Sequence, residues 1–333
     1  MKVIFKPITP VFIGSGEDYY PNDYVVFDEE IGFIDKGKFL DEVIKHNKYE
    51  EFLEVSEDMD KLLDFIYEFG DEFGYDEFCV DFIEGEEDIL NELANTTSRP
   101  LSAFIKDRFL FKPIIPGSSI KGAIRTALLD YLSRMFEIPQ NIRNSKQLEA
   151  YFFCNSEKFD AKKDILKALF VSDFKPKNYR LKVIKPKNRP YKKNKDNQIP
   201  VVIEALIDGE FEGEIRIDKN LLKSDKNLRE NRFFRREPLS VGLIKRALKE
   251  FYKDVLETEN KRFMANKLIY NDYMLKIGRF AGAGSKSIKE KRSVYIRQIR
   301  KNFNYQLSVW INNDENPLGW GRLEFKEWGW NLF

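Results

Sequence analysis

The feature that most constrains the fold is the segment RFLFKPIIPGSSIKGAIRTALLDYLSRMF, in which a short apolar run gives way to a long amphipathic stretch. Pro113 and Pro116 end the apolar run, and Gly117 permits a tight turn. Ser118 or Ser119 can then cap a helix. The apolar residues that follow recur at intervals of three and four: Ile120, Ala123, Ile124, Ala127, Leu128, Tyr131, Leu132 and Met135. This spacing predicts a strand, a turn and a helix with one buried face.

Two cations stand beside the start of this expected helix. Lys121 and Arg125 lie about one turn apart and off the apolar stripe. The first N–H groups of a helix have no acceptor within the helix, and this end of the helix dipole is positive, so an anion is favoured there. We therefore expect a phosphate group to bind near this helix start.

Charge is distributed in blocks along the chain. The net charge of the 333 residues is only +1, which taken alone argues against a nucleic-acid binder. However, residues 50–92 hold eighteen carboxylates and one lysine, whereas residues 175–195 hold ten lysines or arginines and no acid. Residues 276–301 hold nine cations and one acid. The blocks predict one acidic lobe and two phosphate-binding segments, with the solvated surface of a charge-rich protein as the alternative.

The chain length predicts two domains, because 333 residues exceed the usual size of one, roughly 100–200 residues. We expect residues 1–175 to form the first, with an acidic helical insertion at about 38–95. Residues 176–333 would form the second, with a cationic β-hairpin at about 180–205. An opening strand is expected to end in a glycine turn at GSGED. Strands alternating with helices favour an α+β fold with antiparallel, ferredoxin-like sheets.

A second glycine-rich segment, RFAGAGSKS, offers another phosphate site. It is not a Walker A loop, because Ser285 separates Gly284 from Lys286. The small residues Gly282, Gly284 and Ser285 would let a phosphate approach the backbone amides, and nearby cations would attract it. Those cations are Arg279, Lys286, Lys289, Lys291 and Arg292. The alternative is a flexible loop.

Few residues point to catalysis. His46 is the sole histidine and is expected on a helix surface, and Cys79 and Cys154 have apolar neighbours that predict burial. No spacing typical of a metal site or of a nucleophile–base pair occurs. We therefore expect no catalytic residue, no metal ion and no cofactor.

Nothing in the sequence predicts a membrane segment. No run approaches the ~20 apolar residues that a span requires, and MKVIFKPITP lacks the apolar core of a signal peptide. We expect a soluble, cytoplasmic protein without membrane contact.

Several segments together resemble the RAMP (repeat-associated mysterious protein) superfamily of CRISPR effector subunits. They are TPVFIGSGEDYYPNDYVV, RPLSAFIKDRFLFKPIIPGSSIKGAIRTALL, LFVSDF, IEALIDGEFEGEIRID, and RFAGAGSKS with NPLGWGRLEF. Their order and the chain length are similar to those of the fifth Csm subunit of type III-A effectors. The resemblance is weakest over the acidic insertion. IPGSSIKGAIRTALL is specific for RAMP subunits, whereas guide-processing endonucleases share the C-terminal glycine-rich segment.

This resemblance implies two ferredoxin-like, RRM-related RAMP domains that face one another with RNA in the cleft. The helix start and the glycine-rich segment match the family's RNA-contact motifs by position. The cationic hairpin from Lys182 to Val202 resembles the family's thumb, which wedges into the guide–target duplex. The residues expected to contact RNA are Ser118, Ser119, Lys121, Arg125, Lys187, Arg189, Lys192, Lys193, Arg279, Gly282, Gly284, Ser285, Lys286 and Arg292.

The implied function is that of a non-catalytic RNA-binding subunit of a type III-A CRISPR (Csm) complex. It would cap the filament and bind the 3′ part of the guide crRNA in antiviral defence. The expected partners are crRNA, target RNA, neighbouring Csm backbone subunits and host maturation nucleases. Asp18 and Asp23 flank the first glycine segment, where a related RNA-cutting subunit carries its acid, but they lack its Gly-rich context, so that activity is not transferred.

Two alternatives stay open. The chain could be a RAMP-type endoribonuclease that processes guide RNA with His46 as general base. It could also be a protein-only scaffold subunit whose cationic segments bind acidic subunits.

Overall fold

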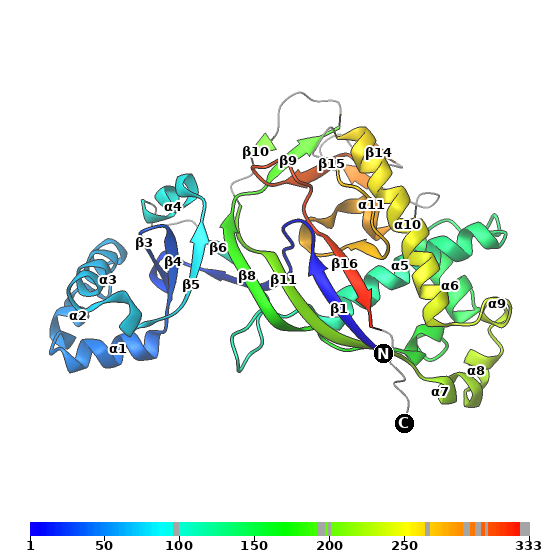
Figure 1. The fold of residues 1–333 in the computed structure, drawn as a ribbon, viewed down its shortest axis with the longest axis horizontal. Helices are drawn as coiled ribbons and strands as arrows, with labels where there is room; N and C mark the ends of the chain where they lie inside the picture. The colour runs from blue at the N-terminus through cyan, green and yellow to red at the C-terminus, as the bar shows by residue number, and fades with distance from the viewer. Residues whose placement is uncertain are drawn as a thin grey trace.

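The computed structural model describes residues 1–95, 100–191, 197–198, 201–263, 267–288, 294–296, 301–303 and 306–326. The strands of these residues form a large mixed sheet on which long helices pack. A smaller lobe extends to one side (Figure 1). The α+β fold class is confirmed.

The centre of the large sheet is a set of four antiparallel strands in the order β16-β1-β11-β8. Along the chain, these strands and two long helices follow the sequence strand, helix, strand, strand, helix, strand. The elements are β1 (Lys2–Pro7), α5 (Gly117–Met135), β8 (Lys175–Ile184), β11 (Val202–Ile217), α10 (Val241–Arg262) and β16 (Trp320–Phe325). This connectivity is that of a ferredoxin-like unit.

Strands from both halves of the chain build this central sheet. In β1, Val3 pairs with Gly213 of β11 on one side and with Phe325 of β16 on the other. The expected boundary at residue 175 coincides with the first residue of β8, inside the sheet. The division of the chain into residues 1–175 and 176–333 stays a prediction.

Further strands extend the sheet and correct two expectations. These strands are β2 (Gly14–Tyr19), β6 (Leu101–Phe104), β7 (Leu169–Val171) and β12 (Met274–Lys276). β6 pairs in parallel with β11, so the sheet is mixed and not purely antiparallel as expected. The turn expected at GSGED lies within β2, where Gly16 has φ +90° and the pairing with β6 shifts register between Gly14 and Asp18. A glycine in this conformation lets the strand bulge without breaking it.

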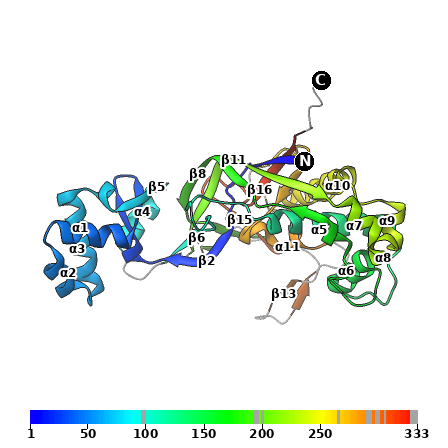
Figure 2. The same cartoon turned by 90° about the horizontal axis from the view of Figure 1, so that it is seen from below.

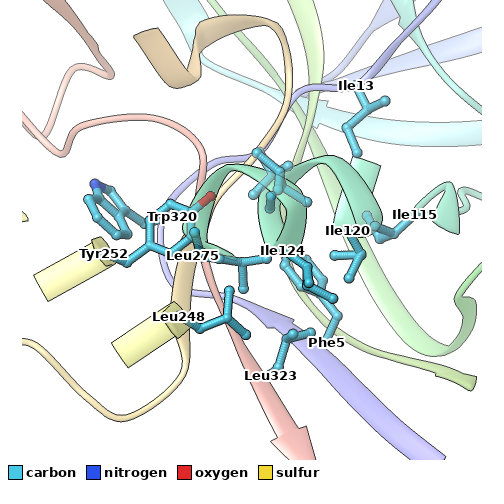
Figure 3. Packing of buried hydrophobic residues seen from close by; sticks show 14 of the residues in the cluster. Phe5, Ile13, Ile115, Ile120, Ile124, Leu248, Tyr252, Leu275, Trp320 and Leu323 are labelled. Atoms are coloured by element: carbon cyan, nitrogen blue, oxygen red, sulfur yellow. The ribbon is translucent and has the colours of Figure 1, made fainter. Parts of the chain in front are cut away.

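Helix α5 confirms the helix predicted from the apolar stripe. Ile120, Ile124 and Leu128 are fully buried. Figure 3 shows Ile120 and Ile124 among side chains of β1, α10 and β16, including Phe5 and Leu248. The helix therefore lies on the sheet with its apolar face inward.

The start of α5 differs from the expectation. Pro116 occupies the N-cap position, and the N–H of Gly117 donates to Asp173 Oδ1 at 2.7 Å. Ser118 and Ser119 lie in the first turn, so the prediction that one of them caps the helix is wrong. Asp173 supplies the capping carboxylate from the segment after β7.

The acidic segment folds as a lobe with strands as well as helices. Its elements are β3 (Tyr24–Phe27), β4 (Glu30–Ile34), α1 (Lys36–Lys45), α2 (Tyr49–Val55), α3 (Met59–Phe73), β5 (Cys79–Gly85) and α4 (Glu87–Ala94). The expectation of helix throughout residues 38–95 is wrong at β5, where CVDFIEG alternates in burial and pairs with β4 and β8. Phe39, Phe65 and Phe69 give the lobe a core of its own.

The cationic hairpin continues from the β8–β11 pair into a separate three-stranded sheet. Beyond Ile184 the chain forms β9 (Lys187–Pro190), which pairs with β10 (Asn197–Gln198) and with β15 (Ser308–Ile311). The base of the predicted hairpin is therefore tied to the C-terminal part of the chain by backbone hydrogen bonds.

The remaining elements surround α5 and α10 or continue the C-terminal part. They are α6 (Ser145–Cys154), α7 (Lys219–Ser224), α8 (Lys226–Arg229), α9 (Arg232–Arg236), α11 (Gly282–Lys286), β13 (Val294–Ile296) and β14 (Lys301–Phe303), with short 3-10 turns at Pro21–Asp23, Tyr75–Glu77, Ile165–Ala168 and Arg279–Ala281. Figure 2 shows α6 to α9 gathered at the end of the molecule opposite the acidic lobe. Among the described helices, none combines the length and the apolar character that crossing a bilayer requires.

Candidate nucleic-acid interface

A cavity of about 620 Å³ lies where three segments distant in the sequence meet. We call it the interface cavity. Its lining residues are Ile13, Gly14, Gly16, Ser118, Ser119, Gly122, Ala123, Thr126, Tyr252, Lys276, Ile277, Gly278, Arg279, Ser285 and Lys286. The start of β2, the first turns of α5 and the glycine-rich segment thus share one concave surface, and five of the expected RNA-contact residues lie on it.

The α5 wall of the interface cavity is polar and open. Ser118 is exposed and Ser119 is half-buried, and one turn further on Gly122 faces open space. A Cβ added to Gly122 would meet no atom within 4 Å. The missing side chain lets a ligand approach the helix backbone closely. We did not expect Gly122 as a site residue, although an isolated glycine inside a helical pattern was a usable signal.

Lys121 and Arg125 lie on α5 outside this lining. The Lys121 ammonium donates to the Leu169 carbonyl at 2.7 Å, and burial lowers its pKa. Arg125 Nε bonds Glu149 Oε2 at 2.7 Å, and its Nη1 bonds Asp164 Oδ2 at 2.8 Å. Both cations therefore hold α5 against its neighbours, and their contact with RNA stays a prediction.

The glycine-rich wall is a pair of short helical turns and not the loop that was expected. Arg279–Ala281 form a 3-10 turn, and α11 follows from Gly282 to Lys286. Gly278 has φ +90°, and an added Cβ there would overlap the Phe12 carbonyl. The Arg279 N–H donates to the same carbonyl at 2.9 Å, which fixes this wall to the segment between β1 and β2.

The glycines of α11 make room for Gln306, which the sequence did not single out. The Gly284 N–H donates to Gln306 Oε1 at 2.9 Å, so this amide already has an acceptor. A Cβ on Gly282 would lie 2.7 Å from Gln306 Nε2. Ser285 is buried and donates to the Ala281 carbonyl at 2.9 Å. These residues shape the wall, and their direct contact with RNA stays a prediction.

A buried ion pair forms the floor. Lys276 Nζ lies 2.6 Å from Glu259 Oε1, and the Lys276 side chain is fully buried. Glu259 also accepts from Trp320 Nε1 at 3.1 Å and from Gln306 Nε2 at 3.3 Å. Burial lowers the pKa of Lys276, and the carboxylate of Glu259 opposes that shift. The floor network thus joins α10, β12 and β16 to the glycine-rich wall.

Two exposed cations stand at the mouth. Arg279 and Lys286 have no ion pair among the residues that the structure describes. Although much of the Lys286 side chain is exposed, its ammonium is partly desolvated by the surrounding chain, and this and the nearby charge of Lys276 lower the pKa of Lys286. Both cations are therefore available to an anion entering the interface cavity.

The hairpin cations lie apart from the interface cavity. Lys187 and Arg189 are in β9, and Arg189 Nη2 bonds Glu315 Oε1 at 2.8 Å. Lys192, Lys193 and Arg292 lie outside the described residues.

The candidate acid–base residues are also elsewhere. His46, at the end of α1, stacks on Phe73 with ring centroids 3.9 Å apart and lies 3.5 Å from Glu42 Oε2. Asp23 accepts from the Tyr20 N–H and pairs with Lys36 at 2.6 Å. No three metal-ligating side chains converge within the described part of the chain.

Substitution of Gly284 tests how tightly the glycine-rich wall is packed. Gly284→Ala is expected to lower the free energy of unfolding by about 1–3 kcal/mol, because the new methyl group overlaps Gln306 Oε1. Urea unfolding followed by circular dichroism measures this loss. Gly122→Ala is the matched control and should be neutral or raise stability by up to about 1 kcal/mol. Equal stability of the two variants would contradict the tight packing.

Solved structures of other proteins share the fold of this chain. A chain in the cryo-EM structure of a Csm–crRNA–target RNA ternary complex of a type III-A CRISPR–Cas system superposes with a TM-score of 0.73 and 20% identity, over 97% of this chain and all of that one. The crystal structure of T. onnurineus Csm5 gives a TM-score of 0.66 and 21% identity over 96% of this chain and 99% of that one. At such identities, these likenesses establish the fold.

Sequence relatives carry the same name. A CRISPR system protein Csm5 of Methanocaldococcus jannaschii is 29% identical over 276 residues, and one of Streptococcus thermophilus is 26% identical over 219 residues. The matches cover 79% and 62% of this chain but only 63% and 60% of the relatives, so the chain spans less than two thirds of their length. The RAMP superfamily model matches residues 4–285, which is most of the 333 residues, and the chain therefore belongs to the RAMP superfamily.

Proposed function

We propose that this chain is a non-catalytic RNA-binding subunit of a type III-A CRISPR (Csm) effector complex. In this role it caps the filament and holds the 3′ part of the guide crRNA. The observation that carries the proposal is the interface cavity, in which Ser118 of α5 and the cations Arg279 and Lys286 face one concave surface. Family membership and the likeness to Csm5 proteins support the assignment to a Csm complex.

The interface cavity suits a phosphodiester backbone. The Ser118 hydroxyl can donate to a phosphate oxygen, and Arg279 and Lys286 supply the attraction that dominates sequence-independent binding. Gly14, Gly16 and Gly122 carry no side chain that would hold the backbone away. Because phosphate contacts carry no sequence information, sequence would be read by pairing between guide and target.

The finer parts of the proposal rest on the resemblance to RAMP proteins. The extension of β8 and β11 through β9 and β10 would be the thumb that meets the guide–target duplex. The strands β13, β14 and β15, which lie outside the central sheet, would contribute to a second ferredoxin-like unit opposite the first. Neighbouring backbone subunits and maturation nucleases that trim the trailing 3′ end would be the protein partners.

The enzyme alternative requires His46 near an RNA 2′-hydroxyl. His46 lies in the acidic lobe against Phe73 and Glu42 and is not among the residues that line the interface cavity. An acidic surface repels RNA, which favours the binding role over the guide-processing role. No observation on the described residues favours the scaffold alternative, in which the cationic segments bind acidic subunits instead of RNA.

Binding of a labelled single-stranded guide RNA across a salt series tests the proposal. Affinity should fall steeply with salt, and Arg279→Ala/Lys286→Ala should weaken binding about tenfold and reduce the salt slope by about 1–2, since each lost phosphate contact contributes about 0.7. Lys249→Ala/Lys253→Ala, on the exposed side of α10, is the matched control.

The same binding reactions also show whether the RNA is cut and whether the other cations contribute to RNA affinity. Lys121→Ala/Arg125→Ala is included because the resemblance assigns RNA contact to those residues. Intact RNA together with salt-dependent binding supports the proposal. RNA that is cut by the wild type and not by His46→Ala would establish the endoribonuclease instead, and binding without salt dependence would favour the scaffold.

A further inference from the structure

An exposed apolar tip projects from the chain between β6 and α5. Phe109, Leu110 and Phe111 have exposed fractions of 88%, 62% and 70%. In Figure 1 the segment between β6 and α5 is a teal loop that projects from the body of the molecule. Three adjacent large apolar side chains are rarely exposed together on the surface of a soluble protein. Such a patch marks an interaction site.

The tip is the end of a tight hairpin and not a loose loop. The Asp107 N–H donates to the Lys112 carbonyl at 2.8 Å, and the Phe111 N–H donates to the Asp107 carbonyl at 2.9 Å. The Asp107 carboxylate accepts from the N–H groups of Phe109 and Leu110 at 3.0 Å each, and these bonds lower its pKa. The tip is therefore preorganised, which reduces the entropy lost on docking.

The base of the hairpin is anchored by an ion pair, and its tip has a strained backbone. Lys106 Nζ, at its base, pairs with the buried Glu204 at 2.7 Å. Phe111, at the tip, has φ +53°, a conformation that bulky residues rarely adopt. Strained residues of this kind persist where the surrounding structure over-determines them, often at functional sites.

The charges next to the tip indicate the chemistry of its partner. Arg108 and Lys112 flank the three apolar residues and are exposed, and neither has an ion pair within the described part of the chain. The one adjacent carboxylate, Asp107, is engaged by backbone amides. A partner would therefore present carboxylates around an apolar pocket.

We propose that residues 108–112 dock into an apolar pocket rimmed by carboxylates on a neighbouring protein subunit of the same effector. This inference rests on the proposed function, because it assumes assembly with other subunits. The pocket receives Phe109 and Leu110, and its rim pairs with Arg108 and Lys112.

Two other occupants fit less well. In a second copy of this chain, the described cavities that combine acids with apolar side chains are either too small for the tip, as around Asp130 and Phe251 at about 60 Å³, or carry cations that would repel Arg108 and Lys112. Those cations are Lys158 and Arg232 in a cavity of about 700 Å³ and Arg322 and Lys326 in one of about 480 Å³. RNA fits less well because no tip residue lines the interface cavity, where the proposed RNA contacts lie.

The experiment measures binding of the isolated chain to a purified subcomplex of the other effector subunits, assembled by co-expression without this chain. Phe109→Ser/Leu110→Ser is expected to weaken binding at least tenfold, with an unchanged melting temperature because neither side chain is buried. Arg108→Glu/Lys112→Glu should also weaken it, more strongly at low salt. The matched control is Ile269→Ser, which removes an apolar side chain that is 86% exposed elsewhere.

The outcomes separate this inference from the proposed function. Equal binding by the wild type and both tip variants would overturn the docking site alone, whereas a wild type that binds no subcomplex would overturn both. Guide-RNA affinity of the isolated chain should be the same for the wild type and Phe109→Ser/Leu110→Ser. A parallel loss of RNA affinity would make the tip an RNA contact, and concentration-dependent self-association that the variant abolishes would make it a contact between copies.

Discussion

Lys276→Met is expected to lower the free energy of unfolding by about 3–5 kcal/mol. The substitution leaves the Glu259 carboxylate buried without its cation, and the hydrogen bonds that it keeps within the described part of the chain come from Trp320 Nε1 and Gln306 Nε2. A buried charge without a counter-charge loses its hydration free energy, and the remaining hydrogen bonds do not compensate for that loss. Chemical unfolding monitored by tryptophan fluorescence measures the effect, and Trp320 itself reports on the site.

Two further variants test whether the unpaired charge of Glu259 causes the loss of stability. Lys276→Met/Glu259→Gln keeps an acceptor for Trp320 but removes the charge, so it should recover much of the lost stability. Lys249→Met breaks an exposed pair with Asp272 at 3.0 Å and should change stability by less than about 1 kcal/mol. If the double variant is less stable than Lys276→Met, the loss comes from packing and not from charge.

Gly122→Glu is expected to reduce guide-RNA affinity by about ten- to a hundredfold without harming the fold. Gly122 lines the interface cavity, and a side chain added there points into open space. A carboxylate about 4 Å from a phosphate is repelled by about 1–4 kcal/mol, depending on the local dielectric, and each 1.4 kcal/mol is a factor of ten in affinity. Glutamate also favours helix more than glycine does, so stability should not fall.

Two neutral variants at the same position separate charge from size. Gly122→Ala should leave RNA affinity within about twofold, and Gly122→Gln should fall between alanine and glutamate because it adds bulk without charge. Fluorescence anisotropy at fixed low salt compares the three. Unchanged affinity in Gly122→Glu would show that RNA does not pass along this face of α5, and the proposed site would be wrong.

Local periodicity was a reliable guide to the elements of this fold. The apolar stripe from Ile120 onward predicted α5, because one side of that helix lies on the sheet. The error at β5 has a physical reason: CVDFIEG lies between two helical stretches, and its strand form depends on pairing with β4 and β8. A single-segment pattern does not contain that pairing partner.

The candidate site was harder to predict, because its residues depend on partners far along the chain. Lys121 and Arg125 looked free for phosphate, but the acceptors Leu169 and Asp164 come from segments that only the tertiary fold brings near. Gly284 looked like part of a phosphate-binding loop, whereas its amide N–H donates to the Gln306 side chain. Sequence patterns identified which segments meet and five of the residues that line the cavity, but not which of the other cations are engaged within the fold.

The position of β1 between β11 and β16 affects how this chain can fold during synthesis. Val3 pairs with Phe325, so the contact order of the central sheet is high and the sheet cannot be completed until residues 320–325 have left the ribosome. The acidic lobe has its own core within residues 25–79 and can become compact much earlier. Until then β1 has an unpaired edge, and a chaperone that covers it would prevent pairing with other nascent chains.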